Sequence, residues 1–173
     1  MRTRHPSNSD KLYIGIDNGV TGTIASIYNN YVKFLKTPVK SEQNYTKKKG
    51  NISRIEFNIL NAWFESLSYF HASSVFCLIE RPMVNPGRFA ASISALRSLE
   101  ATLILIENHK IPFQYIDSKE WQRVMLPKGS KKEQLKIDSK NIGIRLFPNL
   151  AEKIRKHKDA DGLLIAEYCR RYY

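Results

Sequence analysis

A short run of alternating apolar residues near the start of the chain ends in a carboxylate, and it constrains the fold more than any other stretch. In residues 12–17, LYIGID, apolar side chains recur at every second position, which predicts a β-strand ending at Asp17. Asn18-Gly19 is a turn dipeptide, and residues 21–28 are again strand-like, so the pair predicts a hairpin. Asp17 either caps this turn or is a functional group, because open α/β sheets place their chemistry at strand ends.

The rest of the chain alternates between strand-like and helix-like patterns. We expect strands at residues 31–36, 74–80 and 112–116, helices at 53–69, 88–108, 131–147 and 160–172, and a short helix that carries Trp121. The polar residues 37–51 and the proline-rich residues 81–87 predict exposed loops. This order predicts an α/β fold with a mixed five-stranded sheet flanked by helices. A length of 173 residues fits one domain, residues 11–173, after a flexible tail at residues 1–10.

The charge of the chain indicates a polyanionic partner. It has 28 Lys and Arg against 16 Asp and Glu, a formal net charge of +12. We expect nucleic acid rather than a membrane, because no run approaches about 18 uninterrupted apolar residues. The first ten residues lack the apolar core of a secretory signal. Cys77 and Cys169 have no metal-binding spacing, so we expect reduced cysteines in an intracellular protein.

Two further acids follow apolar patterns that turn them inward. Glu80 ends the predicted strand at residues 74–80, and Asp161 begins the last helix on its apolar side. If the strands ending in Asp17 and Glu80 are parallel neighbours, their ends lie about 4.8 Å apart. Two carboxylates at about 4 Å repel by about 4 kcal/mol at an effective dielectric of ~20, which a divalent cation would offset. The acids are either separate caps and ion-pair partners, or together a site for Mg²⁺ or Mn²⁺.

These segments, in this order, resemble a known family. The chain carries IGIDNGVTGTIA, then LIERP, then a basic loop and KDADGLLIAEYCRR, and is similar to the phage-type branch of the RuvC-type Holliday junction resolvases, which are RNase H-like nucleases. The similarity spans residues 12–171. It implies an RNase H-like sheet with Asp17, Glu80 and Asp161 as catalytic metal ligands. The family's fourth ligand is an acid or histidine three or four residues before the last Asp, and here those positions hold Lys158 and His157.

Two residues are candidates for the fourth metal ligand, and different arguments favour each. Residues four apart share a face of a helix, which favours His157 as the partner of Asp161. Charge favours Asp159, which can turn toward the site if the helix begins late. We predict Asp159 as the fourth catalytic and metal-binding residue.

The resemblance implies a Mg²⁺-dependent endonuclease, with Mn²⁺ as an alternative metal, that cuts a four-way DNA junction by paired phosphodiester hydrolysis as a homodimer. One alternative is a non-catalytic branched-DNA-binding protein. Another is an RNase H-like nuclease that acts on RNA or other branched DNA. The opening stretch also resembles the phosphate loop of sugar kinases and actin-like ATPases, but the chain lacks their second domain and adenosine motif.

Basic residues near the expected site are candidate contacts to nucleic acid. Positive side chains near a helix start suit phosphate binding, although a solvated helix face is the alternative. The candidates are Lys128, Lys131, Lys132 and Lys136 around the start of the basic helix, and Arg81 and Arg88 in and after the proline-rich loop. We interpret residues 47–49, KKK, as a solvated loop.

The long helix at residues 88–108 is apolar on more than one side, which favours packing on the sheet and on a second subunit. We assign Phe89 to the core or to this dimer contact rather than to a wedge between bases. Trp63 and Trp121 are assigned to the core.

Overall fold

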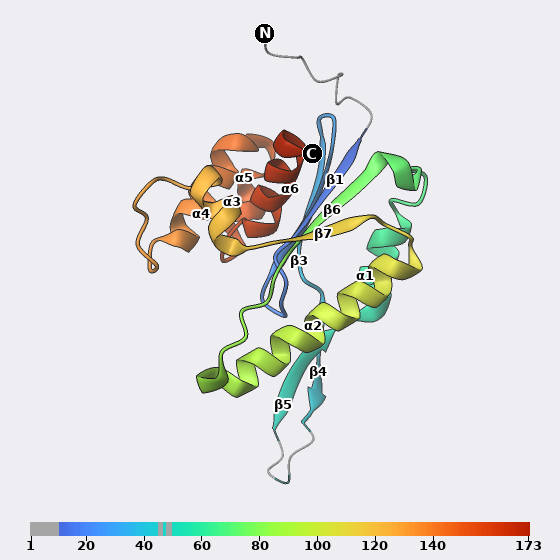
Figure 1. Cartoon of the computed structure of the whole chain (residues 1–173), viewed down its shortest axis with the longest axis vertical. Coiled ribbons are helices and arrows are strands. Elements are labelled where there is room, and N and C mark those ends of the chain that lie inside the picture. Colours follow the sequence, from blue (N-terminus) through green and yellow to red (C-terminus); the bar gives the residue numbers. More distant parts are fainter. Residues whose placement is uncertain (1–10, 45–46, 48–49) are drawn as a thin grey trace.

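The computed structural model describes residues 11–44, 47 and 50–173, so the predicted tail at residues 1–10 and most of the lysine run at residues 47–49 lie outside it. Its centre is a five-stranded sheet of order β3-β2-β1-β6-β7 (Figure 1). β1 pairs with β2 in the antiparallel sense and with β6 in the parallel sense. The predicted mixed five-stranded sheet is therefore confirmed. The strands are β1 (Leu12–Ile16), β2 (Thr23–Tyr28), β3 (Tyr31–Lys36), β6 (Val75–Glu80) and β7 (Phe113–Ile116).

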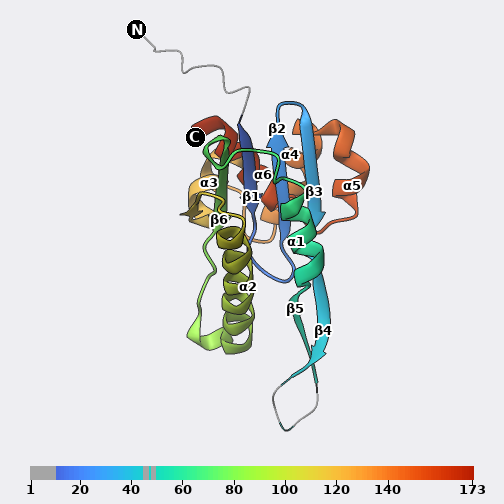
Figure 2. The ribbon, with the colours of Figure 1, turned by 90° about the vertical axis from the view of Figure 1, so that its right-hand side faces the viewer.

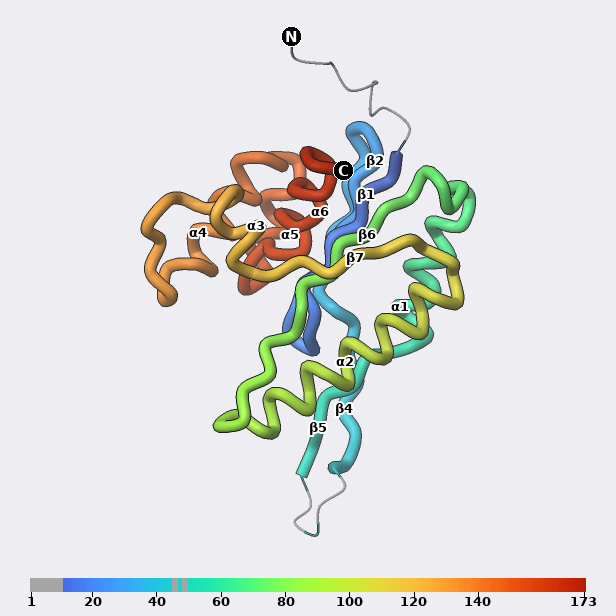
Figure 3. Tube along the Cα trace, viewed as in Figure 1, coloured from blue at the N-terminus to red at the C-terminus, as the bar shows by residue number. Residues whose placement is uncertain are grey.

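The sheet separates two layers of helices, which lie on either side of it in Figure 1; Figure 2 looks onto the layer of α1 and α2, with the other layer behind the sheet. The face that carries Leu12, Ile14 and Ile16 packs on the layer of α1 and α2, whereas Tyr13 and Leu78 face the other layer. Figure 3 traces the chain from the first layer through β7 into the second. The helices are α1 (Phe57–Glu65) and α2 (Phe89–Asn108) in the first layer, and α3 (Ser118–Met125), α4 (Leu135–Leu146), α5 (Ala151–Arg155) and α6 (Asp161–Tyr172) in the second. Three single turns of 3₁₀ helix, Ala72–Ser74, Pro86–Arg88 and Pro148–Leu150, join these elements.

Two glycines let the backbone of α6 touch the sheet. A Cβ atom on Gly15 would lie 2.1 Å from the amide nitrogen of Ala166, and one on Gly162 would lie 2.2 Å from the carbonyl oxygen of Thr23. The amide of Gly162 also donates a 2.9 Å hydrogen bond to Oγ1 of Thr23. The first turn of α6 is thus fixed beside the ends of β1 and β2.

A second, two-stranded sheet replaces the loop expected at residues 37–51. β4 (Val39–Gln43) and β5 (Asn51–Ile55) form a hairpin that projects beyond α2 (Figure 1). Glu42 on β4 accepts hydrogen bonds from Arg54 on β5 at 2.6 Å and forms an ion pair with Lys40 at 3.1 Å. The loop prediction was wrong because these strands are mostly polar and carry no regular apolar alternation, although Ile55 at the end of β5 is buried in the core. The helix expected from residue 53 consequently begins only at Phe57.

Helix α2 leaves much of its apolar surface exposed. Ile93, Leu96 and Ile104 are 39%, 44% and 53% exposed. Phe89 is 72% exposed, so of its two predicted places the core was wrong and the dimer contact stays a prediction. Residues Pro86–Asn108 are long and apolar enough to cross a membrane by length and composition alone, a condition that core helices of soluble proteins also meet. Serines interrupt this stretch, so it holds no continuous apolar run of that length. Of the two tryptophans assigned to the core, Trp121 is fully buried and Trp63 is half-buried.

Candidate active site

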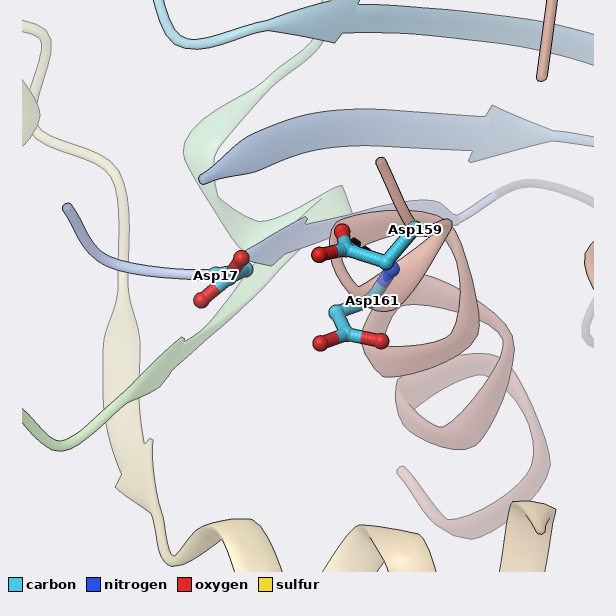
Figure 4. Close-up of side chains that lie close together, drawn as sticks. All are labelled: Asp17, Asp159 and Asp161. Carbon is cyan, nitrogen blue, oxygen red and sulfur yellow. Dashed lines mark hydrogen bonds between the residues drawn. The ribbon is translucent and has the colours of Figure 1, made fainter. Parts of the chain in front are cut away.

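Three aspartates converge where β1 ends and α6 begins. One carboxylate oxygen from each of Asp17, Asp159 and Asp161 lies within 4.8 Å of the other two (Figure 4). Asp17 follows the last residue of β1, Asp161 is the first residue of α6, and Asp159 lies two residues before it. The sheet and the last helix therefore each supply part of one acidic cluster.

Backbone and side-chain hydrogen bonds fix the position of Asp17. Its amide donates to the carbonyl of Thr23 at 3.0 Å, which closes the turn between β1 and β2. The next side chain, Asn18, donates from Nδ2 to the carbonyl of Ala95 in α2 at 3.1 Å. Burial raises the pKa of Asp17 well above its usual range, and the charges of Asp161, Glu80 and Asp159 raise it further.

A buried serine on α4 holds Asp161. Oγ of Ser139 donates to Oδ1 of Asp161 and accepts the amide of Ala160 at 3.1 Å. The amide of Asp161 in turn donates to Oδ1 of Asp159 at 3.4 Å. Burial and the neighbouring charge of Asp159 raise the pKa of Asp161 to about 7, although the bond from Ser139 opposes this rise.

Glu80 ends β6 next to the aspartates but outside their 4.8 Å set. The parallel register pairs Ile16 with Ile79, so Asp17 and Glu80 follow at adjacent strand ends. Nε1 of the fully buried Trp121 donates a 2.7 Å hydrogen bond to Oε2 of Glu80. Burial raises the pKa of Glu80, whereas this hydrogen bond lowers it.

Of the candidates for the fourth position, the structure brings Asp159 to the cluster. The ring of His157 instead packs edge-on against Phe34, with ring centroids 4.8 Å apart. The pKa of Lys158 is lowered, first by the neighbouring amine of Lys136 and then by burial. Helix α6 starts only at Asp161, so the rule for residues four apart on a helix does not apply to His157.

Lys136 faces the acids instead of standing apart as a surface lysine. Its Nζ atom lies 3.3 Å from Oδ2 of Asp159. Partial burial lowers the pKa of Lys136, but the neighbouring amine of Lys158, the hydrogen bond to Asp159 and the charges of Asp159 and Asp161 raise it overall. One cation therefore already compensates part of the negative charge of the cluster.

The other predicted basic residues are exposed to solvent. Lys128, Lys131 and Lys132 lie in the connection between α3 and α4, and Arg88 precedes α2. Nε of Arg81 lies 3.6 Å from Oδ1 of Asp117, and its guanidinium lies over the ring of Tyr115. Arg81 is thus held near the end of β6.

Sequence reasoning missed the two residues that hydrogen-bond to the acids, Trp121 and Ser139, and the contact of Asn18, next to Asp17, with helix α2. A buried Trp usually needs a partner for its indole N–H, so a polar neighbour of Trp121 could have been expected, but the sequence does not identify which residue it is. Nothing in the pattern around Ser139 distinguished it from other polar residues of its helix.

The donor set fits a hard divalent cation. Opposite oxygen ligands of one ion lie about 4.2–5 Å apart, given metal–oxygen distances of about 2.1–2.5 Å. The three aspartate oxygens fall within 4.8 Å of one another. An ion there would favour the charged forms of carboxylates whose pKa values burial has raised. The chemistry of the cluster therefore suits Mg²⁺ or Mn²⁺.

Comparison with known proteins identifies the fold. No protein-family model matches the sequence, and neither does any curated protein. Among solved structures, RuvC of T. thermophilus in complex with Holliday junction substrate matches with a TM-score of 0.52 and 15% identity, over 93% of this chain and 96% of that one. A second Thermus thermophilus RuvC structure matches with a TM-score of 0.50 and 14% identity, over 92% of this chain and 96% of that one. The chain has the RuvC-like, RNase H-type fold.

Proposed function

We propose that this protein is a divalent-metal-dependent endonuclease that resolves four-way DNA junctions by paired phosphodiester hydrolysis. The observation that carries the proposal is the convergence of Asp17, Asp159 and Asp161 at the strand ends of a RuvC-like fold, with Glu80 at the adjacent strand end. The sequence resemblance implies metal-ligand roles for Asp17, Glu80 and Asp161, and the position of Asp159 beside them supports it as the fourth ligand.

The four acids would hold the metal and leave coordination positions open for water and phosphate. Bound Mg²⁺ or Mn²⁺ supplies an activated water and stabilises charge on the attacking and leaving oxygens. Asp17 is fixed by its turn, Asp161 by Ser139 and Glu80 by Trp121, so the ligands are oriented before substrate arrives. Such bonds to the ligands are what keep a metal site in its working geometry.

Branched DNA is the proposed substrate. The net charge of +12 favours a polyanion, and the exposed Lys128, Lys131 and Lys132 lie on the connection that leads into α4, the helix that contacts the acids. The structural neighbour is a complex with a Holliday junction substrate, which supports the same class of DNA for this chain. A protein that acts on cellular or viral DNA works inside the cell, in keeping with its two free cysteines.

A homodimer is the proposed assembly, because a two-fold junction needs two cuts that a two-fold dimer can supply. Ile93, Leu96 and Ile104 expose an apolar face of α2 that a second copy would cover. Phe89 and Ile93 also line an apolar groove of about 490 Å³ between α2 and the β4–β5 hairpin. Sedimentation at micromolar concentration, with and without junction, tests this assembly, and a monomer under both conditions contradicts it.

The function is tested by incubating the protein with an end-labelled four-way junction in Mg²⁺ and in EDTA. Linear duplex and an RNA–DNA hybrid serve as parallel substrates. We expect paired nicks in the junction in Mg²⁺ alone. Junction binding without cleavage would instead identify a non-catalytic branched-DNA-binding protein, and cleavage of the hybrid would identify an RNA-directed nuclease.

A further inference from the structure

We propose that Lys136 is the resident counter-ion of the acidic cluster, which a divalent cation must displace from Asp159 in order to bind. This inference rests on the proposed metal site and concerns how that site is loaded. It assigns Lys136 a role that differs from the phosphate contact predicted from the sequence.

The two oxygens of Asp159 are occupied in different ways. Oδ1 accepts the amide of Asp161 at 3.4 Å, a bond that belongs to the start of α6. Oδ2 accepts the ammonium of Lys136 at 3.3 Å. An ion that coordinates Oδ2 must take the place of this ammonium. The ammonium and the ion therefore compete for the same atom, and their positive charges repel each other.

The geometry makes this lysine displaceable. The side chain of Asp159 is 2% exposed, whereas that of Lys136 is 48% exposed. The carboxylate is thus fixed inside the protein while the lysine reaches it from solvent along a flexible stem. Lys136 can return its ammonium to water without moving α4, which Ser139 anchors to the cluster.

A need for such a counter-ion follows from the charges around it. Asp17, Asp159 and Asp161 share one small volume with Glu80 nearby, and the charges of the last two aspartates and of Glu80 raise the pKa of other acids in the group. Without metal, a single ammonium reduces this repulsion. The amine of Lys158 lies close enough to Lys136 for each to affect the pKa of the other. A test must therefore prevent Lys158 from taking its place.

The test measures Mn²⁺ binding by calorimetry in the absence of DNA, so that cleavage plays no part. The variants are Lys136→Met, which keeps the stem and removes the charge, and Lys136→Met with Lys158→Met. Lys140→Met is the matched control, since Lys140 lies one turn along α4 and its ammonium contacts only the carbonyl of Arg155 at 3.1 Å in the described structure. We expect the first two variants to bind Mn²⁺ more tightly by on the order of tenfold, and the control to bind like the parent protein.

A second readout is thermal unfolding in EDTA and in Mg²⁺. The Lys136→Met protein should unfold at a lower temperature than the parent protein in EDTA, and Mg²⁺ should remove the difference. Equal Mn²⁺ affinity in the parent protein and both Met variants would overturn the role of Lys136 and leave the metal site intact. Weaker binding in the variants would show that Lys136 supports the ligands instead. Absence of Mn²⁺ binding in all of them would overturn the proposed metal site as well.

Discussion

The indole N–H of Trp121 donates a 2.7 Å hydrogen bond to the carboxylate of Glu80, so a fully buried core residue of α3 also holds an acid at the end of β6. The core of the second helix layer and the candidate metal site therefore share a side chain. A substitution in this part of the core is therefore expected to affect the candidate metal site as well.

Trp121→Phe tests this connection, because it keeps an aromatic ring and removes the donor. We expect Glu80 to lose its orientation, so half-maximal cleavage should need a higher Mg²⁺ concentration, by about tenfold if about 1.4 kcal/mol of bonding is lost. Trp63→Phe is the control, since Trp63 packs in the other layer and its Nε1 has no partner among the described residues. Both variants should lose stability, but an equal Mg²⁺ requirement in the two would contradict the role of Trp121.

Ser139→Ala should destabilise the protein by about 1–3 kcal/mol, because it leaves the buried amide of Ala160 without a partner and removes a bond to Asp161. Urea unfolding in EDTA measures this change. Ser130→Ala is the control, because Ser130 makes only a local bond to Pro127 at the surface among the contacts described, and its loss should cost less than about 0.5 kcal/mol. Equal costs at the two serines would show that the contact with Asp161 contributes nothing.

The raised pKa of Asp161 predicts how stability depends on pH. In the folded protein Asp161 loses its proton near its pKa of about 7. In the unfolded chain it loses the proton near the ordinary pKa of 3.8. The folded state thus binds more protons between these values, and metal-free stability should fall as pH rises from 5 to 8, by up to about 1.4 kcal/mol per pH unit for one proton. Asp161→Asn should flatten this slope, and Mg²⁺ should flatten it in the parent protein. An identical slope in the variant would contradict the assignment.

Lys131 and Lys132 are predicted to contact phosphates. Replacing both by Ala should weaken junction binding in EDTA and reduce the slope of log affinity against log salt by about 1–2 units. A matched pair is Lys33 on the edge strand β3 and Lys110 after α2, both exposed and both in other parts of the molecule. If the two double variants change the slope equally, Lys131 and Lys132 contribute only general charge.

The sequence was informative where a buried strand ends in an acid. Asp17 and Glu80 each follow an apolar run, and the crossover rule alone predicts that their strand ends are neighbours. Asp159 was favoured by charge against a helix rule that supported His157, and the late start of α6 explains why the rule did not apply. These are predictions from local pattern and chain order, which a single sequence contains.

Contacts between segments far apart in the chain could not be predicted from the sequence. Ser139 meets Asp161 across 22 residues, and Trp121 meets Glu80 across 41, with no pattern that marks either pair. The polar β4–β5 hairpin was missed because cross-strand pairing, not burial, defines it. The core alternative for Phe89 followed from hydrophobicity alone, which holds on average but does not place one side chain.

The central claim is that the acids hold metal for cleavage and do not bind DNA directly. The most direct measurement compares Asp17→Asn and Glu80→Gln with the parent protein on a labelled four-way junction, with cleavage assayed in Mg²⁺ and binding in EDTA. We expect cleavage to fall by orders of magnitude, because water activation and charge stabilisation both depend on the ligands. Binding should be retained or tightened, since each change removes a negative charge that faces phosphate. Cleavage by both variants as fast as by the parent protein would contradict the claim.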